Sequence, residues 1–135
     1  MDKKLPARFA RAFRDADIRG IAGEELDDDV AYAVARAFVG EFGYQKLVVG
    51  YDMRVSTPGL VEAFIAGVRD AGADVVDVGL VPSTVLYYAS GVLDLPGVMV
   101  TASHSPANYN GLKLVSPGAV PLTKSTGLDA LLRRV

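Results

Sequence analysis

The stretch KLVVGYDMRVSTPGLVEAFIAGVRDAGADVVDVG, residues 46–79, decides the fold. Both of its ends, 46–51 and 74–79, are short runs rich in valine, which is typical of buried strands. Between them, Ser56-Thr57-Pro58 provides a hydroxyl cap and a proline for a helix start, and Gly72 ends the apolar helical spacing that follows. A strand, a helix and a second strand in this order predict a crossover unit in a parallel sheet.

The residues before this stretch predict another helix. From Leu26 to Phe42 the apolar side chains recur at helical spacing, with Asp27-Asp28-Asp29 in the favourable first turn and Gly43 as a stop. Because consecutive side chains on a helix splay around its axis, we interpret the aspartates as a charge cluster at the helix start and not as a metal site.

The residues after the stretch continue the alternation of strands and helices. Pro82-Ser83-Thr84 opens a shorter helix that Gly91 closes, and Gly97–Thr101 is a third strand. A fourth strand at Gly111–Val115 should pair with its predecessor, and Ser125–Val135 predicts a last helix that looks cut short. We therefore predict an α/β fold: a three-layer α/β/α domain with a mixed, mostly parallel four-stranded sheet, occupying residues 1–135 as a single domain.

The composition fits one globular domain and excludes several classes of function. Half of the 135 residues are hydrophobic and 22% are charged, so the chain can bury a core. With 14 Lys and Arg against 16 Asp and Glu, the net charge of −2 predicts neither nucleic acid nor an anionic membrane as a partner. The lack of cysteine and the single histidine exclude disulfide scaffolds, thiol nucleophiles and zinc sites built from these residues.

Hydropathy predicts a soluble chain. No apolar stretch of signal-peptide length stands near the N-terminus, and the longest apolar segment, Val78–Leu93, is shorter than the ~18 residues of a membrane span. We therefore expect a cytoplasmic protein. The mean hydropathy of +0.26 is high for a free-standing domain of this size, which predicts either an extensively buried chain or a partner on one face.

Polar side chains gather where the predicted strands end. Segments 50–52, 79–80 and 101–103 should share one carboxyl edge, and open α/β sheets bind their ligands at that edge. The loop TASHSPANYNG, residues 101–111, contains serine, threonine, histidine and asparagine but no acidic residue. A serine there can accept or carry a phosphoryl group, although loops of this composition are most often plain turns.

Cations would have to balance such a phosphoryl group, because a phosphoserine brings about −1.5 to −2 charges. His104 and Lys113 are the local candidates. Arg14 and Arg19 become available if the fold brings the N-terminal segment over the loop. From the alternation of apolar and polar residues alone, Lys113 would lie on the solvent face of a strand.

Three spaced segments carry a resemblance to a known family. They are Phe13-Arg-Asp-Ala-Asp-Ile-Arg-Gly20, Val49-Gly-Tyr-Asp-Met-Arg-Val-Ser56, and Thr101-Ala-Ser-His-Ser-Pro106 followed by Asn108-Tyr-Asn-Gly-Leu-Lys113. In this order they resemble the N-terminal F-R-x-Y-D-I-R-G signature, the V-G-x-D-x-R-x-S strand and turn, and the active-site serine loop of the α-D-phosphohexomutases. That family includes phosphomannomutase/phosphoglucomutase.

The resemblance implies roles for individual residues. Ser103 matches the serine that is phosphorylated and passes its phosphoryl group to the sugar. His104 and Lys113 match basic residues beside that serine, with roles in phosphate contact or proton transfer, and Arg19 matches the signature arginine that reaches the same site. Further candidates for binding phosphate or substrate are Thr101, Ser105, Asn110 and Arg14.

The chain departs from the family pattern at two positions. Ser105 stands where the family usually has asparagine, and Ala16 stands at the tyrosine position of the N-terminal signature. Neither departure affects the four catalytic candidates. In the middle motif, we interpret Asp52 and Arg54 as a structural ion pair near the sheet edge.

The resemblance implies interconversion of hexose 1-phosphate and hexose 6-phosphate, of mannose or glucose, through a hexose 1,6-bisphosphate intermediate and activator. It also implies Mg²⁺, with the phosphate on Ser103 as one ligand, although the chain contains no D-x-D-x-D cluster. Family members have four domains, and the resemblance covers the first. We therefore expect a fragment that is inactive or nearly so alone, with a sugar phosphate and the remaining domains as partners.

Two alternatives stay open beside the mutase interpretation. The chain could be a stand-alone phosphate-binding or regulatory module that keeps the fold without turnover. It could also be an unrelated Rossmann-like nucleotide binder, but no G-x-G-x-x-G follows the first predicted strand.

Overall fold

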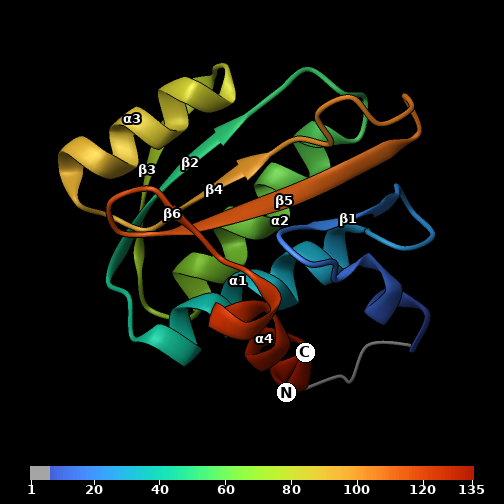
Figure 1. The fold of residues 1–135 in the computed structure, drawn as a ribbon, viewed down its shortest axis with the longest axis horizontal. Helices are drawn as coiled ribbons and strands as arrows, with labels where there is room; N and C mark the ends of the chain where they lie inside the picture. Colours follow the sequence, from blue (N-terminus) through green and yellow to red (C-terminus); the bar gives the residue numbers. More distant parts are fainter. Residues whose placement is uncertain (1–6) are drawn as a thin grey trace.

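The computed structural model describes residues 7–135, which form a mixed β-sheet between two helical layers (Figure 1). The α-helices are α1 (Asp28–Phe42), α2 (Thr57–Asp70), α3 (Ser83–Leu93) and α4 (Asp129–Arg134). The strands are β1 (Ile18–Ile21), β2 (Lys46–Tyr51), β3 (Asp74–Leu80), β4 (Gly97–Val100), β5 (Tyr109–Ser116) and β6 (Val120–Pro121). A 3-10 helix at Ala7–Ala12 precedes β1, and a π-helical turn at Lys124–Leu128 precedes α4.

The sheet has the order β1-β5-β4-β2-β3, with β6 paired to β5. Strand β2 is parallel to both β3 and β4, whereas β5 is antiparallel to β1, β4 and β6. The predicted α/β/α fold and mixed sheet are confirmed. The predicted count of four strands is wrong, since the short strands β1 and β6 extend the sheet to six.

The caps of α1 lie where the sequence predicts them. The Asp27 carboxylate accepts a hydrogen bond from the Val30 backbone N–H at 2.9 Å and caps the helix, with Asp28 and Asp29 in its first turn. Gly43 ends the helix with a φ of 68°, in the left-handed region that favours glycine.

Three helix ends differ from the prediction. The hydroxyl of Ser56 makes no capping bond to α2. Helix α3 continues through Gly91 to Leu93 and ends at Asp94, which adopts a φ of 53°. The predicted last helix begins as a π-helical turn and becomes α-helical only from Asp129, because Gly127 interrupts it with non-helical dihedral angles.

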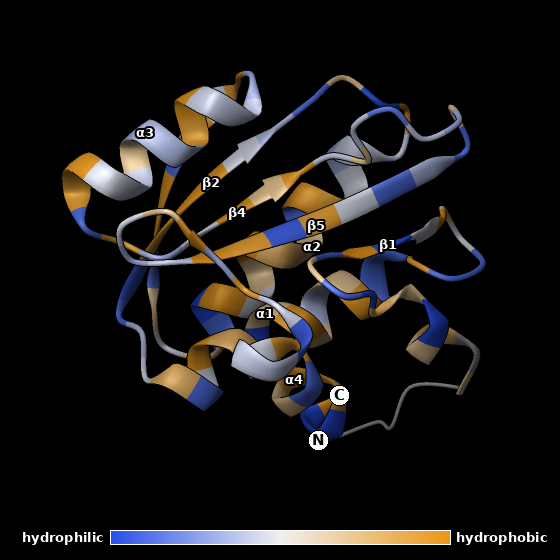
Figure 2. Ribbon diagram, viewed as in Figure 1, coloured by the Kyte–Doolittle hydropathy of each residue, from blue (hydrophilic) through white to orange (hydrophobic). Residues whose placement is uncertain are grey.

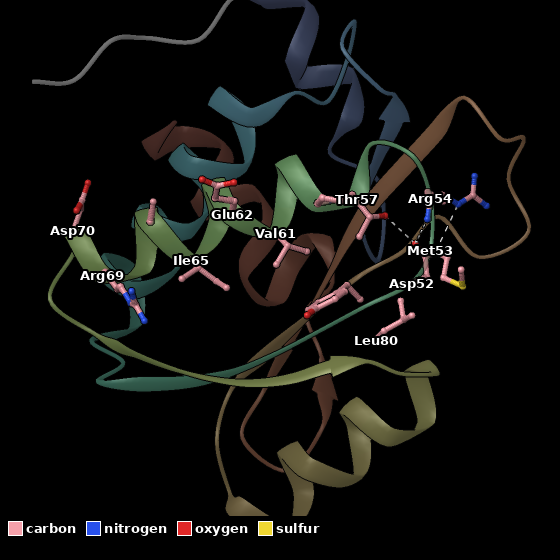
Figure 3. Close-up of a pocket in the computed structure, with 13 residues that line it drawn as sticks. Asp52, Met53, Arg54, Thr57, Val61, Glu62, Ile65, Arg69, Asp70 and Leu80 are labelled. Atoms are coloured by element: carbon pink, nitrogen blue, oxygen red, sulfur yellow. Dashed lines mark hydrogen bonds and ion pairs between the residues drawn. The ribbon is translucent and has the colours of Figure 1, made fainter.

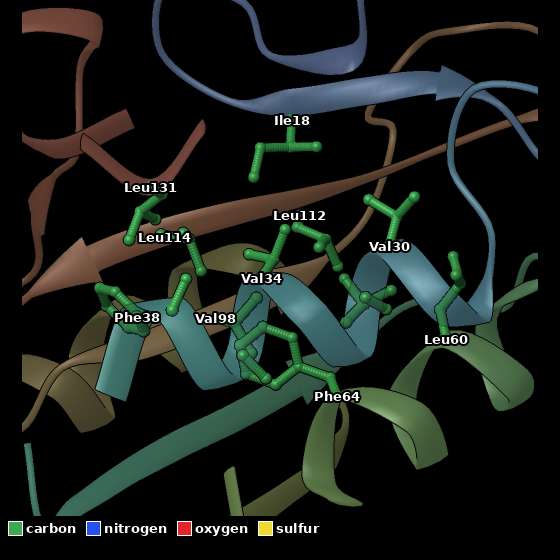
Figure 4. Close-up of a cluster of buried hydrophobic side chains, with 14 of the residues drawn as sticks. Ile18, Val30, Val34, Phe38, Leu60, Phe64, Val98, Leu112, Leu114 and Leu131 are labelled. Carbon is green, nitrogen blue, oxygen red and sulfur yellow. The ribbon is translucent and has the colours of Figure 1, made fainter. Parts of the chain in front are cut away.

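The main core lies between the sheet and the layer formed by α1, α2 and α4 (Figure 4). Ile18, Phe38, Phe64 and Leu112 are among its fully buried side chains. Figure 2 shows hydrophobic residues along the central strands and hydrophilic residues in the loops at their ends. Helix α3 covers the opposite face of the sheet over a smaller cluster formed by Val48, Leu86, Met99 and Val115. Among the described residues, no helix combines the length and apolar character that a membrane crossing requires.

Candidate active site

The carboxyl ends of β2, β3 and β4 lie together at one edge of the sheet, as predicted. The backbone N–H of Asp52 donates to the Val100 carbonyl at 3.1 Å, and that of Val81 donates to the Tyr51 carbonyl at 3.1 Å. These bonds join the three strand ends, and the loop that carries Ser103 follows directly after β4. The topology therefore places this loop where open α/β sheets hold their ligands.

Ser103 is exposed and adopts a left-handed backbone conformation, with a φ of 54°. Its N–H donates to the Thr101 hydroxyl at 3.0 Å, and the Ser105 N–H donates to the Ala102 carbonyl at 3.0 Å. Such backbone angles are uncommon outside glycine and require support from the surrounding structure. The tight turn presents the Ser103 side chain to solvent, with exposed His104 beside it.

Arg54 connects the β2–α2 segment to this loop. Its guanidinium donates hydrogen bonds to the backbone carbonyls of four loop residues and lies 3.7 Å from the Asp52 carboxylate. The acceptors are Ser103 and Ser105 at 2.9 Å, Pro106 at 2.6 Å and Tyr109 at 3.0 Å. The expected ion pair of Asp52 and Arg54 is therefore present. Most contacts of Arg54 are instead hydrogen bonds to the serine loop, and these contacts were not predicted from the sequence.

Asn110 is fully buried below the loop. Its amide nitrogen donates to the hydroxyls of Ser56 at 2.8 Å and Thr57 at 3.0 Å, and its oxygen accepts the Gly111 N–H at 2.9 Å. Both amide hydrogens are thus used inside the protein, which leaves no donor for a phosphate. The structure places Asn110 in the framework under the loop. It likewise gives Thr101, which is 5% exposed, a bond within the loop.

The N-terminal segment does come over the loop, because β1 pairs with the start of β5. Arg19 lies opposite Gly111 in this pairing. A pocket of about 450 Å³ beside β1 and β5 is lined by Arg14, Arg19 and Lys113, together with Asp15 and Asp17. Three of the predicted cations therefore share one pocket.

Arg19 has unused hydrogen-bonding capacity. Its Nη1 donates to the Ser105 hydroxyl at 3.3 Å, and its Nε lies 3.7 Å from the Asp17 carboxylate. That Nε is buried, and no acceptor among the described residues is within hydrogen-bond range of it. A buried donor without an acceptor is costly. The Arg19 side chain as a whole is 32% exposed, and Nη1 carries a second hydrogen besides the one donated to Ser105, so the guanidinium can also donate to an anion in the pocket.

A second, larger groove of about 810 Å³ runs along α2 at the carboxyl ends of β2 and β3 (Figure 3). Apolar side chains line most of it, including Val61, Ile65 and the exposed Met53 and Leu80. Asp52 and Arg54 stand at one end, and none of the four predicted catalytic residues lines it. The groove and the cation pocket are thus separate features near the same edge of the sheet.

The described residues do not form a magnesium site by themselves. Within 7–135, no three histidine, aspartate or glutamate side chains lie close enough together to hold a metal ion. Magnesium prefers several oxygen ligands. These residues would therefore supply only the phosphate oxygen expected on Ser103.

Fold and site together define a class. It is an α/β/α domain with an exposed serine loop at the carboxyl edge of the sheet and a pocket of cations lined by the N-terminal segment and by Lys113 of β5. The comparison with known families agrees, since the profile of phosphoglucomutase/phosphomannomutase, alpha/beta/alpha domain I, matches residues 10–134. The chain belongs to this family.

Individual relatives support the same assignment. A phosphomannomutase from Klebsiella pneumoniae is 46% identical over 123 residues, which cover 90% of this chain and 78% of the relative. A phosphomannomutase from Escherichia coli strain K12 is 45% identical over 123 residues, and the match covers 27% of its length. A crystal structure of a phosphoglucomutase/phosphomannomutase family protein from Burkholderia thailandensis superposes with a TM-score of 0.83 at 40% identity, covering 96% of this chain and 30% of that one.

Proposed function

We propose that this chain is the phosphoserine-bearing domain of a phosphohexomutase that interconverts hexose 1-phosphates and hexose 6-phosphates of mannose or glucose. The observation that carries the proposal is the exposed Ser103, held on a tight turn in a loop whose Ser105 hydroxyl accepts a hydrogen bond from Arg19, a residue that lines a pocket together with Arg14 and Lys113. Membership of the family supports the same chemistry. The expected compartment is the cytoplasm.

The reaction needs a serine that both gives and takes a phosphoryl group. In the first transfer, the bond between phosphorus and Ser103 Oγ breaks while a sugar hydroxyl forms a new bond to phosphorus and loses its proton, and Oγ takes up a proton as it leaves. The resulting hexose 1,6-bisphosphate turns over in the site. In the return step, the bond between phosphorus and the other sugar oxygen breaks while Oγ forms a new bond to phosphorus. Oγ gives up its proton, and the departing sugar oxygen takes one.

The cations near the loop stabilise this transfer. Phosphoryl transfer depends mainly on alignment and on compensation of charge on the phosphoryl oxygens. We assign that compensation to Arg19 and Lys113, with Arg14 lining the same pocket. A serine hydroxyl is a weak nucleophile, so a base must take its proton in the return step, and His104 or Lys113 is our candidate.

The remaining parts of the site are assigned to other domains. The chain spans 27% of the Escherichia coli relative and 30% of the Burkholderia chain. Met53 and Val55 at the carboxyl edge are 82% and 99% exposed, as expected for a surface that faces further protein. We propose that such domains supply sugar recognition and the other Mg²⁺ ligands, and that the chain alone does not turn over.

Mass spectrometry of the protein from its native source tests the proposal, combined with a hexose phosphate mutase assay of variants of the full-length protein. We expect phosphate on the peptide that contains Ser103, and loss of activity in Ser103→Ala. The matched control is Ser125→Ala, an exposed serine near the C-terminus that should keep full activity. Undiminished turnover in Ser103→Ala contradicts the mutase assignment. Phosphate binding by a native 135-residue protein without turnover would identify a binding module instead.

A further inference from the structure

Every hydrogen-bond donor on the side-chain head of Arg54 faces the protein. The four hydrogens on Nη1 and Nη2 match four loop carbonyls, and Nε faces Asp52 at 3.7 Å. The side chain is only 16% exposed. Arg54 therefore has no free donor for a phosphoryl group, in contrast to Arg19.

These bonds fix the direction of the peptide units around Ser103. In a trans peptide the C=O and the following N–H point in opposite directions. Because Arg54 draws the carbonyls of Ser103 and Pro106 toward itself, the N–H groups of His104 and Ala107 point away from it, toward the exposed side of the loop. Among the described residues, the His104 N–H has no hydrogen-bond acceptor.

The arginine is itself held by the start of α2. The Asp52 carboxylate accepts from the Arg54 backbone N–H at 3.2 Å and from the Thr57 hydroxyl at 3.0 Å. Thr57 in turn accepts from the buried Asn110 amide at 3.0 Å. The loop is thus held from one side by Arg54 and at its end by Asn110, through one continuous hydrogen-bond network.

We propose that Arg54 is a positioning residue for phosphoryl transfer: it sets the left-handed turn at Ser103 and the outward direction of the neighbouring N–H groups without touching the phosphoryl group. This inference rests on the proposed function of Ser103. Lysine cannot replace Arg54, because a single ammonium offers three donors from one point and cannot reach four carbonyls in the geometry of a planar fork.

The test compares variants of the full-length protein. Since a misplacement of about 1 Å can cost about 10²-fold in rate, we expect Arg54→Ala and Arg54→Lys to lower kcat by roughly that factor while KM changes little. Millimolar guanidinium added to Arg54→Ala should restore part of the rate. The control is Arg36→Ala, which removes an exposed arginine whose guanidinium lies over the Tyr32 ring on α1 and should leave kcat unchanged.

The outcomes separate this inference from the proposed function. Full activity in Ser103→Ala defeats the proposed function. The inference alone is defeated if Ser103→Ala is inactive but Arg54→Ala keeps the wild-type kcat. It is also defeated if Ser103→Ala is inactive and added guanidinium restores none of the rate that Arg54→Ala loses. If Arg54→Ala fails to fold, NMR order parameters of residues 103–109 in Arg54→Lys decide. Values below about 0.6 support the positioning role, whereas values near 0.85, typical of rigid backbone, overturn it.

Discussion

Replacing Asn110 by alanine tests whether the amide under the serine loop is a framework group or a phosphate ligand. The side chain is fully buried and makes three hydrogen bonds, to the Ser56 hydroxyl, the Thr57 hydroxyl and the Gly111 N–H. Alanine removes all three bonds and leaves the buried Gly111 N–H without its side-chain acceptor. A framework role therefore predicts a loss of stability in the chain without any substrate.

The magnitude follows from the number of bonds. Each hydrogen bond contributes about 1 kcal/mol net, so the loss of three lowers the free energy of unfolding by about 3 kcal/mol. For a domain of this length, that corresponds to a decrease of roughly 10 °C in the unfolding midpoint. Urea unfolding followed by circular dichroism measures the first value, and thermal unfolding measures the second.

Asn108→Ala is the matched control. Asn108 lies in the same loop with an exposed side chain, and its backbone carbonyl, which alanine retains, accepts from the Ala22 N–H at 2.8 Å. We expect a change within about 0.5 kcal/mol for this surface substitution. If Asn110→Ala is equally mild and instead weakens only the binding of phosphate, the framework argument is refuted and the ligand role predicted from the sequence is correct.

Three further predictions concern other parts of the chain. Lys113→Met should slow phosphoryl transfer in the full-length protein by about 10²–10⁴-fold if Lys113 moves a proton, with an unchanged unfolding midpoint. Gly91→Ala should stabilise the chain by about 0.5–1 kcal/mol in urea unfolding, because Gly91 is exposed on α3 and no atom lies within 4 Å of the added Cβ. Gly67→Ala should destabilise the chain by about 1–3 kcal/mol in the same assay, because the added Cβ would lie 2.5 Å from a carbonyl oxygen of α1. Burial, and then the charge of Asp17, raise the pKa of Tyr87 above its ordinary value of 10.0. The stability that the protonated Tyr87 contributes is therefore present below pH 10.0 and is lost as the pH rises through the raised pKa. A phenolate absorbance titration should show that Tyr87→Phe removes a late-ionising group, and the absence of such a change would contradict this prediction.

Local patterns were sufficient for most of the elements. Helices α1 and α2 follow from apolar spacing and from Gly43 and Gly72, and the central strands follow from valine-rich runs. Strand β1 was missed because it has only four residues and no periodic signal, and it forms by pairing with 109–112, far along the chain. The predicted end of α3 was too early, because the helix continues past Gly91 for two residues, Val92 and Leu93, and Asp94 provides the left-handed end that the sequence had suggested for glycine.

The candidate site was predictable only in part. Ser103, His104, Lys113 and Arg19 were named from motif resemblance, and the structure brings Arg19 and Lys113 into one pocket. The loop contacts of Arg54 could not be predicted, because they go to backbone carbonyls. Any residue supplies a carbonyl, so no side-chain pattern in the loop marks them.

The network explains physically why the motif at 49–56 and the serine loop occur together. A left-handed serine costs about 1–3 kcal/mol, and the loop's own bond from the Ser103 N–H to Thr101 returns only about 1 kcal/mol. The four carbonyl bonds from Arg54 more than offset the difference, but a guanidinium that is 16% exposed needs the Asp52 carboxylate beside it. Asp52 is oriented by Thr57, and Thr57 by Asn110 at the end of the loop. Each motif thus supplies the groups that hold the other in place, so neither sets the conformation at Ser103 alone.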